Sequence, residues 1–125
     1  MSRQLPDLFG YLDYRGYLRD AYASLKEHQR GFSYRAFARK AGMSSPNFLK
    51  LVIDGKRNLG ATSIGQFAKA LELGTRETEF FRELVAFNQA STAAEKNEHF
   101  GRLGKYRSRS PLTGQTADLI FQDTS

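Results

Sequence analysis

The 125-residue sequence predicts an all-α fold, a compact bundle of about six helices. Apolar residues recur every three or four positions in successive segments, which is the periodicity of helices with one buried face. Glycines and good N-cap residues separate these segments, and only three prolines occur in the chain. A chain of this length can form one hydrophobic core. We therefore predict a helical domain over residues 1–106 and an arm or linker over residues 107–125.

The segment after Asp13 has the clearest helical pattern. Asp13 is a good N-cap residue, and apolar residues follow it at i, i+3, i+4, i+7, i+8 and i+11 as far as Leu25. The pattern predicts an amphipathic helix that runs to about His28.

Three further helices are expected in the second half of the chain. The first covers about residues 61–73 and stops at Gly74. Thr75 caps the second, which covers about residues 75–90 and closes the core with a broad aromatic face. A threonine and a glutamate three residues later match a capping box, which predicts a third helix at 92–106.

Two short helices joined by a glycine are predicted in the middle of the chain. Ser33 is the expected N-cap of the first, which runs to Ala41, and Gly42 supplies the left-handed residue that turns the chain. The second helix is expected at about 45–54, and Gly55 ends it. Two helices that are separated by three or four residues with glycine in the turn are typical of a helix-turn-helix.

The second of these helices has unusually many apolar residues. Three of them share the predicted inward face: Phe48, Leu51 and Val52. Asn47, Lys50 and Asp54 share another face at i, i+3 and i+7. Leu49 and Ile53 widen the apolar arc beyond one buried stripe. They are either covered by the helix after Asp13, which we favour, or exposed for thymine methyl groups or another protein.

The positive charge of the chain is concentrated in the same region. The formal net charge is +6, and residues 30–58 contain seven bases against one acid. A basic surface of this kind is suited to a polyanion. Charge and motif together favour nucleic acid over an ordinary solvated face.

Several positions together carry a resemblance to a known family. They are Ala38, Gly42, Ser44, Ser45, Phe48, Leu51, residues 55–58 and residues 67–71. This pattern resembles the Cro/C1 (lambda-repressor-like) helix-turn-helix family over roughly residues 32–73. The flanks at 12–15, 32–35 and 80–85 resemble, more narrowly, an uncharacterised family of bacterial regulators with such a domain at the N-terminus.

The resemblance implies a regulator of transcription that binds double-stranded DNA with its second helix in the major groove. Ser45, Asn47 and Lys50 would then contact base edges; asparagine suits adenine and lysine suits guanine. Six residues would contact phosphates: Tyr34, Arg35, Ser44, Lys56, Arg57 and Asn58. A homodimer on two half-sites about 34 Å apart is expected, with the helix at 92–106 and the tail at 117–121 as candidate dimer surfaces.

Two other functions compete with this interpretation. If Leu49 and Ile53 are exposed, the domain is a protein-interaction module that no longer binds DNA, a hypothesis that the apolar tail at 117–121 also favours. RNA binding is a third hypothesis, which has only the charge and the tyrosines in its favour.

The sequence argues against an enzyme. His28 and His99 are the only histidines, and each is expected on a polar helix face. The chain has no cysteine to form a thiolate metal site, and few titratable groups could converge at one site. We therefore expect no catalytic residue, metal site or cofactor. No segment approaches the roughly 20 apolar residues of a membrane span, and we expect a cytoplasmic protein without membrane contact.

Overall fold

The computed structural model describes residues 5–108 of the chain, and it confirms the all-α prediction. These residues form six α-helices and one short 3₁₀ helix, and no strand occurs among them. The elements are η1 (Leu8–Gly10), α1 (Tyr14–His28), α2 (Tyr34–Ala41), α3 (Phe48–Ile53), α4 (Ala61–Ala70), α5 (Thr75–Gln89) and α6 (Ala93–Ser108). Most of the predicted arm, and the candidate dimer surface at 117–121, lie outside the described residues.

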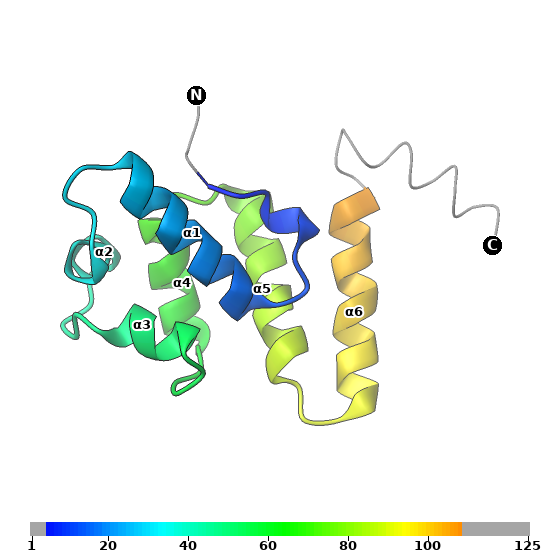
Figure 1. Ribbon diagram of the computed structural model, residues 1–125. Helices are drawn as coiled ribbons and strands as arrows, with labels where there is room; N and C mark the ends of the chain where they lie inside the picture. The colour runs from blue at the N-terminus through cyan, green and yellow to red at the C-terminus, as the bar shows by residue number, and fades with distance from the viewer. Residues whose placement is uncertain (1–4, 109–125) are drawn as a thin grey trace.

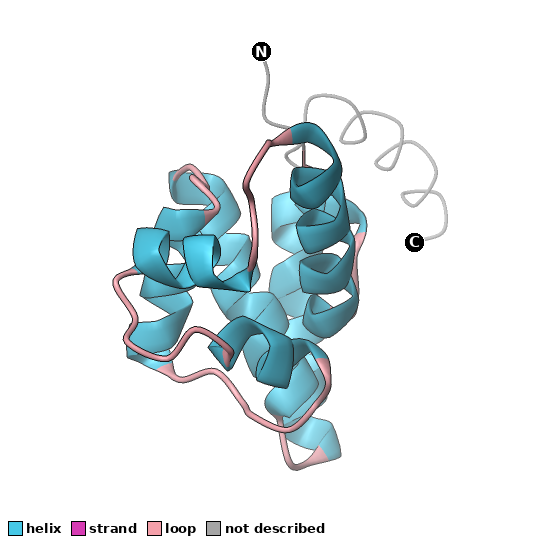
Figure 2. Ribbon diagram, turned by 60° about the vertical axis from the view of Figure 1, so that its left-hand side comes forward, coloured by secondary structure: helices cyan, strands magenta, loops and turns pink. Residues whose placement is uncertain are grey.

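Helix α5 occupies the centre of the bundle, as its aromatic face predicted. It contacts α1, α4, α6 and η1, and Figure 1 shows it between the α1–α4 group and α6. Four of its residues are almost completely buried: Phe80, Phe81, Leu84 and Val85. Helix α2 packs on α3 and α4, and α3 packs on α1. Figure 2, turned so that the side of α2 and α3 comes forward, shows the helices joined by loops and no strand in the described part of the chain.

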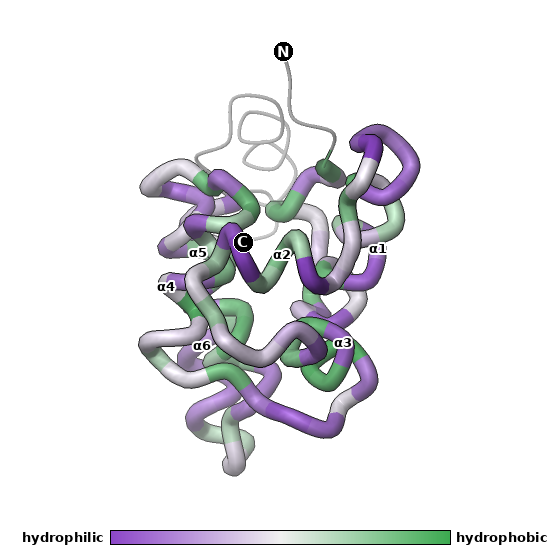
Figure 3. The backbone as a smooth tube through the Cα atoms, turned by 90° about the vertical axis from the view of Figure 1, so that its left-hand side faces the viewer, coloured by the Kyte–Doolittle hydropathy of each residue, from purple (hydrophilic) through white to green (hydrophobic). Residues whose placement is uncertain are grey.

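Burial follows side-chain polarity closely within residues 5–107. No polar or charged residue among them is buried, and no buried side-chain nitrogen or oxygen lacks a hydrogen bond. Figure 3 shows hydrophilic stretches in the loop that follows α1 and in the loop beside α3. Within this part of the chain no helix has the length and apolar character needed to cross a membrane.

The predicted caps at the start of α1 and α2 are confirmed. A carboxylate oxygen of Asp13 accepts from the backbone N–H of Arg15 at 3.1 Å. The hydroxyl of Ser33 accepts from the backbone N–H of Ala36, also at 3.1 Å. Each cap satisfies one of the free N–H groups in a first helical turn.

The end of α4 differs from the prediction. The helix ends at Ala70 rather than Leu73, because Glu72 takes the left-handed conformation with φ +58°. The Leu73 N–H then donates to the carbonyl of Ala68 at 2.9 Å and closes the last turn. Glutamate rarely adopts this conformation, so the sequence pointed to Gly74 instead.

Gly74 begins α5 rather than ending α4. It is the N-cap residue, and Thr75, the predicted cap, is the first residue of the helix. The Glu77 carboxylate accepts from the Gly74 N–H at 2.9 Å, which places a negative charge at the positive end of the helix dipole.

Helix α6 packs along α5. Its sequence pattern predicted the N-cap correctly but not the partner of Glu95 or the position of His99. Thr92 caps it as predicted, accepting from the Glu95 N–H at 3.1 Å, but the Glu95 carboxylate reaches Ser91 instead of Thr92. His99 does not lie on a polar face as predicted. Its ring is within 2.8 Å of the Glu83 carboxylate of α5, in the interface between the two helices.

Candidate nucleic-acid interface

The two short helices in the middle of the chain are joined by a tight turn. Gly42 has φ +76°, a left-handed conformation that suits glycine, and the Met43 N–H donates to the Ala38 carbonyl at 2.9 Å. At the other end, Gly55 has φ +81° and stops α3. Both glycine predictions are confirmed.

Helix α3 is shorter than the predicted range of 45–54. It covers only Phe48–Ile53, and Asn47 is its N-cap residue, whose carbonyl accepts from the Leu51 N–H at 3.0 Å. Pro46 disfavours a helical conformation in the residue before it, and a turn at 46–47 precedes the helix. Ser45 and Asn47 therefore lie in the loop that leads into α3.

The buried face of α3 is also rotated from the predicted one. Leu49 is 3% exposed and Val52 is fully buried, whereas Phe48 and Leu51 are only half-buried. Ile53 is half-buried and packs against the core. Leu49 is therefore buried, as in the favoured alternative, whereas Ile53 is only partly covered; α1 is one of the helices that contact α3.

The three predicted base-contacting residues are exposed on one stretch of chain. Ser45 and Asn47 lie before α3 and Lys50 lies on it. Within residues 5–108 the side chain of Asn47 forms no hydrogen bond. Lys50 is already engaged, because its ammonium donates to the Asp54 carboxylate at 2.9 Å. This hydrogen bond raises the pKa of Lys50 and holds the pKa of Asp54 below its ordinary value.

The predicted phosphate-contacting residues separate into two groups. Arg35 and Ser44 line one hollow of about 200 Å³ between α2 and the residues before α3. Lys56, Arg57 and Asn58 are exposed in the loop beyond the other end of α3. The two groups therefore flank the short helix.

Tyr34 takes a different position from the other predicted phosphate contacts. Its ring stacks on Tyr22 of α1, with centroids 4.1 Å apart and planes 5° from parallel, and it is half-buried. The stack joins α1 to the first turn of α2. Tyr34 therefore has a structural contact that the sequence did not indicate.

Arg15 organises the loop after α3 from the neighbouring helix α1. Its guanidinium donates to the carbonyls of Val52 and Arg57 and, at 2.7 Å, to the side-chain oxygen of Asn58. The Asn58 side-chain oxygen is thus occupied, although the residue is exposed. No local sequence pattern predicts this role of Arg15, because its partners lie 37 or more positions away.

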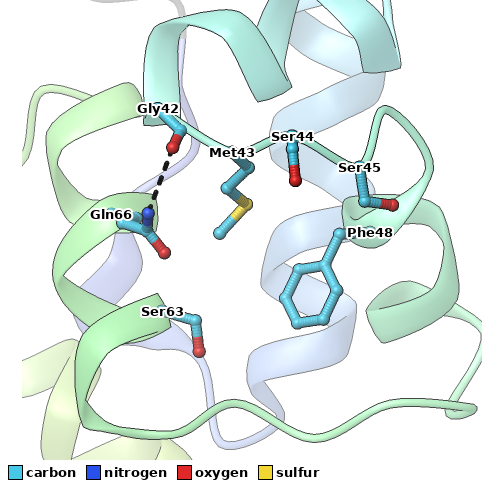
Figure 4. Close-up of a pocket in the computed structure, with 7 residues that line it drawn as sticks. All are labelled: Gly42, Met43, Ser44, Ser45, Phe48, Ser63 and Gln66. Carbon is cyan, nitrogen blue, oxygen red and sulfur yellow. Dashed lines mark hydrogen bonds between the residues drawn. The ribbon is translucent and has the colours of Figure 1, made fainter.

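A second, more open hollow of about 320 Å³ lies between the α2–α3 turn and α4 (Figure 4). Met43 and Phe48 form its apolar part, and hydroxyl groups surround them. The Gln66 amide donates to the Gly42 carbonyl at 3.4 Å and bridges the turn to α4. Met43 and Ser44 line both hollows, so the two lie next to each other.

Charged partners divide the bases of this region into two sets. Lys40 is paired with Glu72 at 2.7 Å and Lys50 with Asp54. Among the residues that the structure describes, the five other bases of residues 30–58 have side chains with no ion pair: Arg30, Arg35, Arg39, Lys56 and Arg57. The charge of Arg19 on α1 also acts on Asp54, so α1 adds a base to the same side.

The geometry defines a small helical protein with a basic, exposed segment on each side of a largely covered six-residue helix. Comparisons with known protein families, curated proteins and solved structures find no match to this chain.

Proposed function

We propose that this protein is a transcriptional regulator of the Cro/C1 type that binds double-stranded DNA through α2, α3 and the segments that flank α3. One observation carries the proposal: within the described residues the bases around α3 are exposed and largely without acidic partners, while Leu49 and Val52 of α3 are buried. Unpaired exposed bases suit the phosphate backbone, which supplies most of the affinity for DNA.

Base recognition in this arrangement depends on few residues. Asn47 is free to bind adenine N6 and N7 in the major groove, and Ser45 lies two residues before it. Lys50 has to leave Asp54 before it can reach guanine. One well-formed contact discriminates between bases by about 1–3 kcal/mol, so we expect modest sequence preference from each monomer.

A second copy of the chain would supply the remaining specificity. Two copies on half-sites about 34 Å apart would place both α3 regions on one face of the duplex. Helix α6, on which Phe100 is 50% exposed, is the surface that we propose for the dimer.

The protein-interaction alternative is less well supported than DNA binding. Leu49 is 3% exposed and belongs to the core cluster, and Ile53 is half-buried. The apolar residues at 117–121, which also motivated this alternative, lie outside the described residues. We propose no second function.

Fluorescence anisotropy with labelled duplexes at several salt concentrations tests the proposal. Replacing Lys56 and Arg57 by alanine should weaken binding to all sequences alike and flatten the salt dependence by about one unit per lost contact. Asn47→Ala should instead change the preference among sequences. Absence of binding to any duplex at low salt would refute the proposal, and selection from a random pool would report half-site spacing.

A further inference from the structure

The smaller hollow beside α3 has a lining made of donors and apolar groups. The lining residues are Arg35, Ala38, Arg39, Met43, Ser44 and Pro46. The arginines and the serine can donate hydrogen bonds, and the other three side chains are apolar. No acidic side chain lines the hollow.

The two arginines of this hollow have no counter-charge within residues 5–108. Arg35 and Arg39 are one turn apart on α2, so their side chains extend from the same helix face, where like charges repel. Neither side chain forms a hydrogen bond or an ion pair among these residues, whereas the next base, Lys40, is paired with Glu72. The fold thus provides an acid for the lysine and none for the pair of arginines.

We propose that this hollow, which we call the seat, is the binding site for a single phosphodiester of the DNA backbone, held by Arg35, Arg39 and Ser44. The inference rests on the proposed function and adds Arg39 to the phosphate contacts that the sequence predicted. Guanidinium groups donate two parallel hydrogen bonds to phosphate oxygens. The exposed hydroxyl of Ser44 adds a third donor, and the apolar side chains suit the carbon atoms of the adjoining sugars.

The position of the seat explains how a six-residue helix can be held on DNA. The seat lies just before Ser45 and Asn47, and Lys56 and Arg57 lie beyond the opposite end of α3. Phosphate contacts on both sides fix the orientation of the segment between them. Arg39 therefore helps to align the base-contacting residues with the base edges of the duplex, without contacting a base itself.

Arg39→Ala tests the seat, and Arg82→Ala is the matched control. Both arginines are exposed and unpaired within the described chain, but Arg82 lies on α5, away from the hollow. In anisotropy titrations with a random-sequence duplex, Arg39→Ala should weaken binding about five- to tenfold. Its salt slope should fall by about 0.9. Arg82→Ala should change neither quantity, and circular dichroism should show both variants folded.

Two further measurements make the outcomes distinct. The Nε–H signals of Arg35 and Arg39 in NMR spectra should shift when duplex DNA is added and stay unchanged with inorganic phosphate at the same phosphate concentration. If duplex DNA and inorganic phosphate shift these signals equally, the DNA backbone is not the occupant of the hollow. The same conclusion follows if structured RNA competes for the protein as well as duplex DNA does. If the wild type binds duplex DNA but Arg39→Ala binds it as tightly as Arg82→Ala does, the phosphate site is refuted and the proposed function is not. Failure of the wild type to bind any duplex refutes the proposed function itself.

Discussion

Replacing Arg15 by methionine should destabilise the protein and loosen the loop after α3. Methionine keeps much of the length of the side chain but removes all three hydrogen bonds, to Val52, Arg57 and Asn58. Hydrogen bonds from a charged donor each contribute about 1.5–3 kcal/mol, and two of these three are exposed to solvent. We therefore expect a total loss of about 2–3 kcal/mol. For a domain of this size that loss lowers the melting temperature by roughly 8–15 °C.

Thermal and urea unfolding followed by circular dichroism measure this loss. Arg19→Met, on the same helix but at an exposed position, is the control and should change stability by less than about 0.5 kcal/mol. Hydrogen exchange of the amides at 55–58 should accelerate in Arg15→Met and not in Arg19→Met. If Arg15→Met melts within about 2 °C of Arg19→Met, Arg15 does not hold the loop as described.

Three further predictions use other features of the fold. Asp54→Asn should strengthen duplex binding about two- to fivefold, because it frees Lys50 and removes a negative charge beside the phosphates; anisotropy measures the change. Gly42→Ala should cost about 1–2 kcal/mol because of its left-handed φ, whereas Gly65→Ala, in open space on α4, should add about 0.5–1 kcal/mol; urea unfolding compares them. Burial and a hydrogen bond to a carboxylate raise the pKa of Tyr11 to about 12. Its contribution to stability should therefore be complete below pH 10 and lost as the pH rises from about 10 to about 12, a loss that Tyr11→Phe removes.

Each of these predictions has an outcome that contradicts it. Weaker binding by Asp54→Asn would mean that the carboxylate helps the interface. Equal effects of the two glycine variants would show that the conformation of Gly42 does not matter. A stability profile of Tyr11→Phe that matches the wild type above pH 10 would remove Tyr11 as the titrating group.

The sequence predicted the features that depend on neighbours a few residues away. The caps at Asp13 and Ser33 need only a side-chain oxygen near the N–H groups of the next turn. Gly42 and Gly55 were recognisable because a left-handed residue is needed wherever a helix ends in a sharp turn. Glu72 was missed because it takes the same conformation without being a glycine, with its carboxylate paired to Lys40 of another helix.

The buried face of α3 was decided by packing between distant segments. A six-residue helix with five apolar side chains has no distinct polar stripe, so its periodicity does not single out Leu49 over Leu51. Helix α3 packs on both α1 and α2, and Leu49 and Val52 are the side chains that this packing leaves buried. Exposure of Ser45, Asn47 and Lys50 agrees with the prediction, because polar residues lie at the surface whichever apolar face is buried.

The Tyr22–Tyr34 stack provides an intrinsic optical signal at the junction of α1 and α2. The chain has six tyrosines and no tryptophan, so its near-ultraviolet spectrum comes almost entirely from tyrosine. Parallel rings in van der Waals contact couple their transitions, and separation of the two helices would change that spectrum. Movement of α2 away from α1 can therefore be followed in unlabelled protein, without a dye on the basic surface.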